Sequence, residues 1–335
     1  MCIFSKKGVF GVIHPIKTIP VFKQYIWGGS TLEEKYGKPI ADHFAAESWE
    51  ISCHKDGLCM VANGEFAGKT LAEAIAADPK AMVGSEEMGE FPLLLKLLDA
   101  KADLSVQVHP DDAYANLHEN GSLGKTEMWY VISAEPGAKL VYGVKDGVTR
   151  EALGEAIEAG TPEELLNYVP VEAGDCFYIP AGTLHAIGAG LLIAEFQQSS
   201  NTTYRVYDYN RVGADGKKRE LHVEKALDVI DFSGSSDKEK DPKVRMIGTA
   251  KETELVNSEF FITYKYEIQD KLTVDDREGF ELLLFPEGEG EIIYDGGALA
   301  VAPGDSVFIP AALDGYTVTG ECELLRCYLP CGGAQ

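Results

Sequence analysis

Two histidines, a glutamate and a glutamine are the residues of this chain whose types and spacing suit metal chemistry. Gln107 and His109 lie two positions apart in the strand-like run SVQVHP, so both side chains emerge on one face of a strand. Glu127 begins a second strand-like run, EMWYVI, and His185 follows a turn rich in glycine and proline. Two neutral imidazoles, a carboxylate and an amide oxygen suit a borderline cation such as zinc, with water in a remaining position. We therefore expect these four side chains to hold one divalent metal, zinc.

Each of these residues has a plainer interpretation when it is taken alone. His109 precedes Pro110 and could simply end a strand. A lone His185 would be a satisfied core or loop histidine, Glu127 a solvated residue at a strand start, and Gln107 an ordinary polar group of the barrel. Their joint occurrence therefore carries the metal hypothesis.

The segment before His185 favours the ligand interpretation. It reads G-x5-P-x-G-x2-H, formed by Gly174, Pro180, Gly182 and His185, and it resembles the second signature motif of the cupin barrels. The other histidines have no comparable partners in the sequence, so we expect them to be structural or exposed: His14, His43, His54, His118 and His222.

Short strands dominate the pattern around these residues. The runs are rich in β-branched and aromatic residues and are bounded by Gly, Pro, Asn or Asp; they read SVQVHP, EMWYVI, AKLVYGV, DCFYIP, LLIAEF and TYRVYDY. This pattern is typical of an antiparallel barrel or sandwich. The sequence therefore predicts a mostly β protein, two cupin-type (jelly-roll) β-barrels with a few short helices.

Helical signals are fewer. KTLAEAIAADP has Thr70 and Glu73 in capping-box spacing and a stop at Asp78-Pro79. The segment PDDAYANL after His109 predicts a helix opened by Pro110. A further helical stretch, TREALGEAIEAGTPEELLNYV, is expected to be an insertion between two strand-rich blocks.

An internal repeat indicates two domains. GDCFYIPA, which begins at Gly174, recurs as GDSVFIPA, which begins at Gly304. The second copy has Gly315 where the first has His185, and the last histidine of the chain is His222, so the second copy cannot build an imidazole metal site. The predicted domains are a catalytic metal-binding cupin domain with a helical insertion, a linker and a metal-free cupin-like domain, at 1–232, 233–243 and 244–335.

Bulk properties narrow the class of protein. A chain of 335 residues that is 45% hydrophobic is long enough for two packed cores. Its formal net charge of −24 argues against nucleic acid or an anionic membrane as a partner, so an anionic ligand needs a local basic cluster. Seven cysteines without a C-x-x-C pair, and no recognisable signal peptide or membrane span, predict reduced thiols and a cytoplasmic location.

Several motifs together resemble one enzyme family. QVHP at Gln107, KTE at Lys125, GTLHA around His185 and the long string QSSNTTYRVYDYNR at 198–211 closely resemble the type I phosphomannose isomerases. WGG and AESWE near the N-terminus extend the resemblance over nearly the whole chain, and the compact length is similar to the short bacterial form. These enzymes are zinc-dependent cupins that interconvert mannose 6-phosphate and fructose 6-phosphate.

The resemblance implies roles for individual residues. Gln107, His109, Glu127 and His185 match the family's metal ligands, and Arg205 matches its active-site arginine. Lys96, Ser105 and Lys125 match residues that line its sugar-phosphate pocket. We therefore expect Arg205, Lys125 and Lys96 to be catalytic, with Ser105 among the residues that bind substrate. Some members have a histidine directly before the lysine of the KTE motif, where this chain has Gly124.

The chemistry of these side chains agrees with that expectation, although alternatives remain. Arg205, permanently charged, suits either the developing enediolate or the phosphate; it could instead be a strand-face arginine paired with Asp208. Lys96 lies among leucines, where a charge is costly unless it points into a polar cavity. It is a candidate for phosphate binding or for a base of shifted pKa; otherwise it is a lysine that reaches solvent from a strand edge. The sequence assigns no catalytic base.

The leading hypothesis is thus a zinc-dependent aldose-ketose isomerase that acts on a small hexose phosphate, as a monomer or homodimer. The alternative from another class is a non-catalytic sugar-phosphate-binding or regulatory cupin. An iron cupin oxygenase fits less well, because such sites use two histidines and one carboxylate and Gln107 would occupy an extra place. The second barrel, which lacks histidine, is expected to have a structural role.

Overall fold

The computed structural model describes residues 13–213, 216–233 and 242–330 of the chain. It contains two compact units: one comprises Met1–Val21, Trp49–Leu95 and Asp241–Gln335, and the other Phe22–Ser48 and Lys96–Lys240. Each unit is therefore assembled from more than one stretch of sequence. Most of the predicted linker at 233–243 lies outside the described residues, and the predicted domain boundaries stay a prediction.

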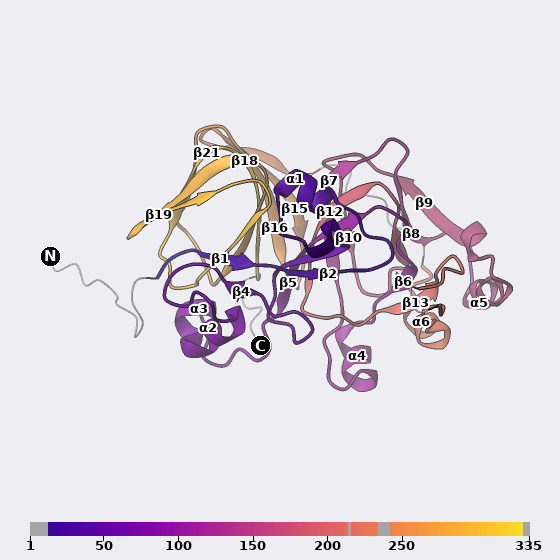
Figure 1. Cartoon of the computed structure of the whole chain (residues 1–335). Helices are drawn as coiled ribbons and strands as arrows, with labels where there is room; N and C mark the ends of the chain where they lie inside the picture. The colour runs from indigo at the N-terminus through magenta and orange to yellow at the C-terminus, as the bar shows by residue number, and fades with distance from the viewer. Residues whose placement is uncertain (1–12, 214–215, 234–241, 331–335) are drawn as a thin grey trace. The chain divides into compact units, whose positions relative to one another are not determined.

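A ten-stranded sheet forms the first unit (Figure 1). Its main path runs β14-β15-β16-β21-β18-β20-β1-β4, with β17 paired to β21 and β19 paired to β18. The strands are β1 (Ile16–Ile19), β4 (Met60–Val61), β14 (Val244–Ile247), β15 (Ala250–Asn257), β16 (Ile262–Ile268), β17 (Lys271–Val274), β18 (Glu281–Tyr294), β19 (Gly297–Val301), β20 (Asp305–Ile309) and β21 (Tyr316–Tyr328).

The second unit contains a five-stranded sheet and the strands β7, β10 and β12 of a six-stranded sheet. The five-stranded order is β13-β6-β11-β8-β9, with β6 (Val106–Val108), β8 (Lys139–Val144), β9 (Leu166–Pro170), β11 (His185–Ile187) and β13 (Tyr204–Tyr207). The six-stranded order is β10-β7-β12-β5-β3-β2, with β2 (Val21–Lys23), β3 (Glu47–Ile51), β5 (Leu93–Ala100), β7 (Glu127–Ala134), β10 (Cys176–Ile179) and β12 (Leu191–Gln198). All six strand-like runs of the sequence are strands, and the mostly β prediction is confirmed; the two closed barrels stay a prediction.

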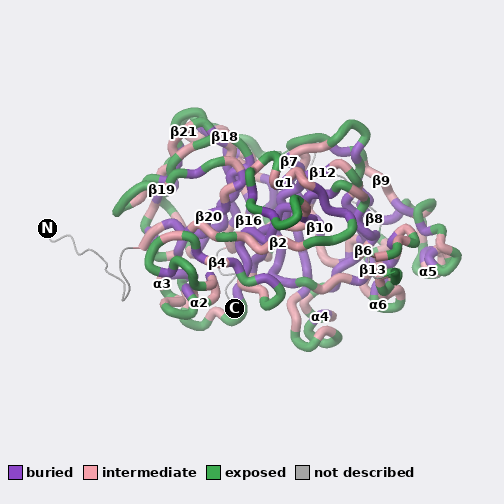
Figure 2. Tube along the Cα trace, in the orientation of Figure 1, coloured by how far each residue is buried: buried purple, intermediate pink, exposed green. Residues whose placement is uncertain are grey.

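Apolar side chains from the two sheets pack into one core in this unit. Trp129 of β7 and Phe177 of β10 come from the six-stranded sheet, and Leu140 of β8 and Ile187 of β11 from the five-stranded sheet. All four are buried, and Figure 2 shows the buried tube concentrated on the strands. The packed core holds the two sheets together, so it fixes the strand ends that carry the polar residues.

The helices are short. They are α1 (Thr31–Tyr36), α2 (Leu71–Ala77), α3 (Pro79–Val83), α4 (Asp112–His118), α5 (Arg150–Ala159) and α6 (Val223–Val229), with 3₁₀ turns η1 (Ala41–His43) and η2 (Pro162–Leu165). Thr70 and Glu73 form the predicted capping box of α2, and α4 follows Pro110 as predicted. None of the helices in the described part of the chain has the length and apolar character that crossing a membrane requires.

One helical prediction is wrong at its C-terminal end. The stretch TREALGEAIEAGTPEELLNYV forms α5 and η2, but its end is strand β9, which pairs with β8. Gly160 adopts a left-handed φ of 75° and ends α5, and Pro162 follows it. The aromatic and β-branched residues Tyr168 and Val169 then pair with β8 as an antiparallel strand.

The sequence repeat has a counterpart in strand register. GDCFYIPA contains β10, which pairs with β7 so that Ile179 lies opposite Glu127. GDSVFIPA contains β20, which pairs with β18 so that Ile309 lies opposite Glu281. Glu281 therefore holds, in the second copy, the register position that Glu127 holds in the first.

Arginines surround Glu281. Its carboxylate accepts hydrogen bonds from Arg326 Nη2 at 2.6 Å, Arg277 Nε at 2.9 Å and the Tyr316 hydroxyl at 2.7 Å. Burial alone would raise the pKa of Glu281, but Arg326 and Arg277 lower it overall. The second copy thus compensates its buried carboxylate with guanidinium groups.

Candidate active site

Three adjacent strands bring distant residues into one row. In the five-stranded sheet Gln107 of β6 lies opposite His185 of β11 on one side and opposite Arg205 of β13 on the other. Directly paired residues on antiparallel strands point to the same face, and neighbouring strands lie about 4.8 Å apart. The register therefore places an arginine one strand from Gln107 and two strands from His185.

His109 and Glu127 complete a buried cluster with His185. His109 follows β6 and Glu127 is the first residue of β7. His109 Nε2 lies 3.7 Å from Glu127 Oε2, and His185 Nε2 lies 3.4 Å from Glu127 Oε1. The three donor atoms all lie within 4.8 Å of one another. Ligand atoms that share a tetrahedral zinc are roughly 3.4 Å apart, so this cluster has the dimensions of a metal site.

Both imidazoles are oriented by backbone carbonyls. His109 Nδ1 lies 2.9 Å from the Thr202 oxygen, and His185 Nδ1 lies 2.9 Å from the Thr183 oxygen. Because a carbonyl only accepts, each Nδ1 carries the proton and each Nε2 lone pair faces Glu127. Burial and then Lys125 lower the pKa of both rings, that of His185 to about 3, so both are neutral. These are the protonation states that metal ligands need.

Glu127 is the least satisfied member of the cluster. Its Oε1 is buried and has no hydrogen-bond partner among the described residues, whereas Oε2 accepts from Lys125. Burial and the neighbouring Glu195 raise the pKa of Glu127 to about 7. Gln107 Nε2 lies 3.4 Å from His185 Nε2, and rotation of the amide would present its oxygen at the same point. An orphaned carboxylate oxygen beside two imidazole lone pairs fits a divalent cation.

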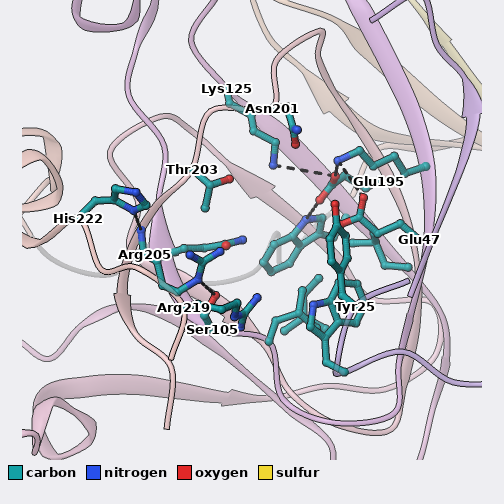
Figure 3. Close-up of a pocket in the computed structure, with 17 residues that line it drawn as sticks. Tyr25, Glu47, Ser105, Lys125, Glu195, Asn201, Thr203, Arg205, Arg219 and His222 are labelled. Atoms are coloured by element: carbon teal, nitrogen blue, oxygen red, sulfur yellow. Dashed lines mark hydrogen bonds and ion pairs between the residues drawn. The ribbon is translucent and has the colours of Figure 1, made fainter. Parts of the chain in front are cut away.

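A cavity of about 290 Å³ opens beside this cluster (Figure 3). Its lining includes Gln107 and all four residues predicted to contact substrate, namely Lys96, Ser105, Lys125 and Arg205. The structure therefore brings together every predicted site residue, since His109, Glu127 and His185 form the adjoining cluster. Sequence reasoning missed other lining residues, which are Tyr25, Trp27, Glu47, Leu98, Leu104, Trp129, Ile187, Glu195, Asn201, Thr203, Arg219 and His222. His222, which was expected to be structural or exposed, also lines the cavity (Figure 3).

Lys96 lies between two carboxylates. Its Nζ is 3.3 Å from Glu195 and 3.7 Å from Glu47, and β5 is an interior strand of its sheet. Burial alone would lower the pKa of Lys96, but Glu47 and Glu195 raise it overall. The two carboxylates therefore favour the charged form of Lys96. The alternative of a lysine at a strand edge is wrong, and a base of shifted pKa stays a prediction.

Lys125 links the cluster to the cavity. Its Nζ lies 3.0 Å from His109 Nε2, contacts Glu127 and is 4.0 Å from Glu195. Gly124, directly before it, has no room for a side chain, because an added Cβ would meet the backbone carbon of Asp111 at 2.5 Å. The backbone of this loop thus requires glycine at position 124.

The Arg205 side chain binds Ser105 and the backbone at Glu220. Its Nε donates to Ser105 Oγ at 3.1 Å and its Nη1 to the Glu220 carbonyl at 3.0 Å. Asp208 instead binds Arg211 and Arg219. The alternative interpretation of Arg205 as the partner of Asp208 is therefore wrong.

Comparisons with known proteins agree with this geometry. The family model of the phosphomannose isomerase type I catalytic domain matches residues 16–127, and that of the mannose-6-phosphate isomerase cupin domain matches residues 251–329. A probable mannose-6-phosphate isomerase of Bacillus subtilis is 42% identical over 93% of this chain and 98% of its own length. The mannose-6-phosphate isomerase of Streptococcus mutans is 41% identical over 90% of this chain and 93% of its own length.

Solved structures show the same relationship. The crystal structure of the mannose 6-phosphate isomerase from Bacillus subtilis matches with a TM-score of 0.89 and 38% identity, covering 94% of this chain and 99% of that one. A putative mannosephosphate isomerase from Archaeoglobus fulgidus shares the fold, with a TM-score of 0.71 and 22% identity over 94% of this chain and 97% of that one. The chain therefore belongs to the type I phosphomannose isomerase family.

Proposed function

We propose that this protein interconverts mannose 6-phosphate and fructose 6-phosphate with one zinc ion per chain. Gln107, His109, Glu127 and His185 would hold the ion. The observation that carries the proposal is the juxtaposition of the buried His109–Glu127–His185 cluster with a cavity that three basic predicted residues line. A sugar phosphate needs both features, since it brings oxygens to be polarised at one end and an anion at the other.

The reaction requires ring opening, removal of a proton from C2 and return of a proton to C1 through an enediol. A zinc ion held by Gln107, His109, Glu127 and His185 would supply a Lewis acid for the substrate oxygens and for the negative charge that develops on them. Arg205 can donate to an oxygen that gains negative charge, and its charge persists throughout. Lys125 lies against the cluster and lines the cavity, so it can hold or donate a proton at the reacting oxygens.

Other residues set limits on the proton transfer. His109 and His185 direct their Nε2 lone pairs at Glu127 and the proposed ion, so neither is available as a base. Lys96 is protonated between Glu47 and Glu195, where it offsets two negative charges inside the cavity. We therefore propose Lys96 as a residue that binds and orients the sugar, and leave the base unassigned.

The site of action is proposed to be the cytoplasm, and the assembly a monomer or homodimer. None of the five described cysteines forms a disulfide, which agrees with a reducing compartment. No specific observation favours the alternative of a sugar-phosphate binder without turnover.

An isomerase assay tests the proposal. Purified protein loaded with zinc should convert mannose 6-phosphate to fructose 6-phosphate, and chelation with verified metal removal should abolish turnover until zinc is restored. Folded, metal-loaded protein without measurable turnover would refute the activity. Turnover that survives complete metal removal would refute the zinc requirement.

A further inference from the structure

The cavity extends beyond Arg205 to a short segment that flanks β13. β13 is the edge strand of the five-stranded sheet. The His222 backbone N–H donates to the Arg205 carbonyl at 2.7 Å, and the Arg205 N–H donates to His222 Nδ1 at 3.2 Å. The backbone N–H and carbonyl of Arg205 therefore point toward this segment and away from β6. Arg205 and Gln107 thus form a non-hydrogen-bonded pair, in which the two side chains lie close together. The row of residues thus runs His185, Gln107, Arg205 and then Arg219 with His222.

Arg219 is held in place by one buried carboxylate. Its Nε donates to Asp208 Oδ2 at 2.8 Å, and its Nη2 binds the other oxygen, Oδ1. Asp208 is 5% exposed and also accepts from Arg211 Nε at 3.1 Å. Tyr209 and Asn210 have φ values of 52° and 55°, which turn the chain so that Arg211 returns to Asp208. Two guanidinium groups on one carboxylate leave a net positive charge.

The two arginines of Asp208 have different surroundings. Arg211 contacts the Asp103 carbonyl through Nη1 and does not line the cavity. Arg219 lines the cavity, and its Nη1 makes no hydrogen bond within the described ranges. Arg205 Nη2 is likewise without a hydrogen bond there. Burial and the nearby charge of Arg219 lower the pKa of Arg205, so the two neighbouring cations repel each other. An anion between them would relieve that repulsion.

We propose that Arg219, fixed by Asp208, binds the phosphate group of the substrate together with Arg205 and thereby selects phosphorylated sugars. This inference rests on the proposed function, which supplies the sugar phosphate. His222 Nδ1 accepts a backbone N–H, so a neutral ring carries its proton on Nε2 and can donate to the same anion. Figure 3 shows Arg205, Arg219 and His222 on the left of the cavity.

The charges at the opposite end of the cavity favour one orientation of the sugar phosphate. Glu47 and Glu195 lie on the right in Figure 3, where they pair with Lys96, so this end has less positive charge to offer a phosphate dianion than the end with Arg205 and Arg219. A hexose 6-phosphate carries its phosphate and its reacting carbons at opposite ends of the carbon chain. Arg219 therefore anchors the phosphate beyond Arg205, which leaves C1 and C2 for the His109–Glu127–His185 cluster.

The test uses sorbitol 6-phosphate, which has the phosphate but no carbonyl to isomerise, titrated calorimetrically into metal-loaded protein. Arg219→Met should weaken its binding on the order of 10- to 100-fold, because two charge-assisted hydrogen bonds are lost. Arg211→Met is the matched control, since it also removes one ion pair from Asp208 but no cavity group; its binding should stay within about twofold of wild type. Melting temperatures of both variants verify folding.

Turnover gives a second readout. Arg219→Met should raise KM for mannose 6-phosphate far more than it lowers kcat, Arg219→Lys should recover part of the loss, and Asp208→Asn should raise KM although Asp208 touches no ligand. Equal effects of Arg219→Met and Arg211→Met, or unchanged binding in Arg219→Met, would overturn the assignment. If wild-type protein binds sorbitol 6-phosphate through Arg219 yet turns nothing over, the proposed function fails while the phosphate site stands.

Discussion

Glu127 is the residue on which the metal hypothesis depends most. Its Oε1 is buried without a hydrogen-bond donor among the described residues, and two neutral imidazoles face it. A cation bound there compensates a buried charge that the folded protein otherwise leaves incomplete. Zinc loading should therefore stabilise the protein, by about 2.7 kcal/mol when zinc is present at about 100 times its dissociation constant.

We predict that Glu127→Gln removes this zinc-dependent rise in melting temperature. The variant should also bind far less zinc by elemental analysis and lose at least about 100-fold in kcat/KM, since a neutral amide is a much poorer ligand than a carboxylate. Glu135→Gln is the control, because its carboxylate is 68% exposed and pairs with the exposed Lys101. A Glu127→Gln protein with the wild-type zinc content would contradict the assignment.

Residues whose roles follow from local motifs could be predicted from the sequence. Residues that only the pairing of distant segments brings to the site could not. Gln107 and His109 lie two apart in one strand-like run, and His185 lies within a cupin-like motif, so their convergence could be expected. Arg219 lies in the polar stretch GKKREL, where nothing distinguishes it from a solvated surface residue. Only the pairing of its segment with β13 and the contact with Asp208 bring it to the cavity.

At the scale of elements, the loop before β7 depends on Gly124. An alanine there would bring its Cβ to 2.5 Å from the Asp111 backbone, which cannot move without disturbing α4. We predict that Gly124→Ala destabilises the protein by about 1–3 kcal/mol and lowers kcat, because Lys125 shifts with the loop. Gly89→Ala is the control, since its added Cβ meets nothing within 4 Å. Chemical denaturation and the isomerase assay measure the two effects.

Strand β18 contains a second buried charge cluster. Arg326 and Arg277 compensate Glu281, the register equivalent of Glu127. Arg326→Met should destabilise the protein by about 3 kcal/mol, because a buried carboxylate loses a partner. Lys251→Met is the control: its side chain and that of its partner Glu267 are each 44% exposed, so it should cost less than about 1 kcal/mol. Similar losses of stability in the two variants would show that the Glu281 cluster contributes no more than an exposed ion pair.

The same cluster sets a pH dependence. In the folded protein Arg326 and Arg277 hold the pKa of Glu281 below its ordinary value of about 4.5. Its contribution to stability is therefore present above about pH 4.5 and is lost as the pH falls through the lower folded value. Melting temperatures between pH 7 and pH 3 should fall more steeply for wild type than for Glu281→Gln. Parallel curves of melting temperature against pH would contradict the assignment of the acid sensitivity to Glu281.

At the scale of the whole molecule, strands from the two ends of the sequence pair with each other in one sheet. β1 pairs with β20, with Ile16 opposite Phe308, and β4 pairs with β1 in the same sheet. This pairing supports the proposal that the C-terminal copy has a structural role. A chain that ends at Ser233 would lack β14–β21 and leave β1 an exposed edge. We predict that it aggregates or unfolds in chromatography and circular dichroism; a stable, fully active fragment would contradict the proposal.

Zinc titration of metal-stripped protein tests the central claim most directly. Isomerisation of mannose 6-phosphate is measured as zinc is added, with bound metal counted by elemental analysis. The account predicts activity that rises in proportion to bound zinc and reaches its plateau at one ion per chain, and no such rise in Glu127→Gln. Full activity in protein verified to contain no metal would contradict it.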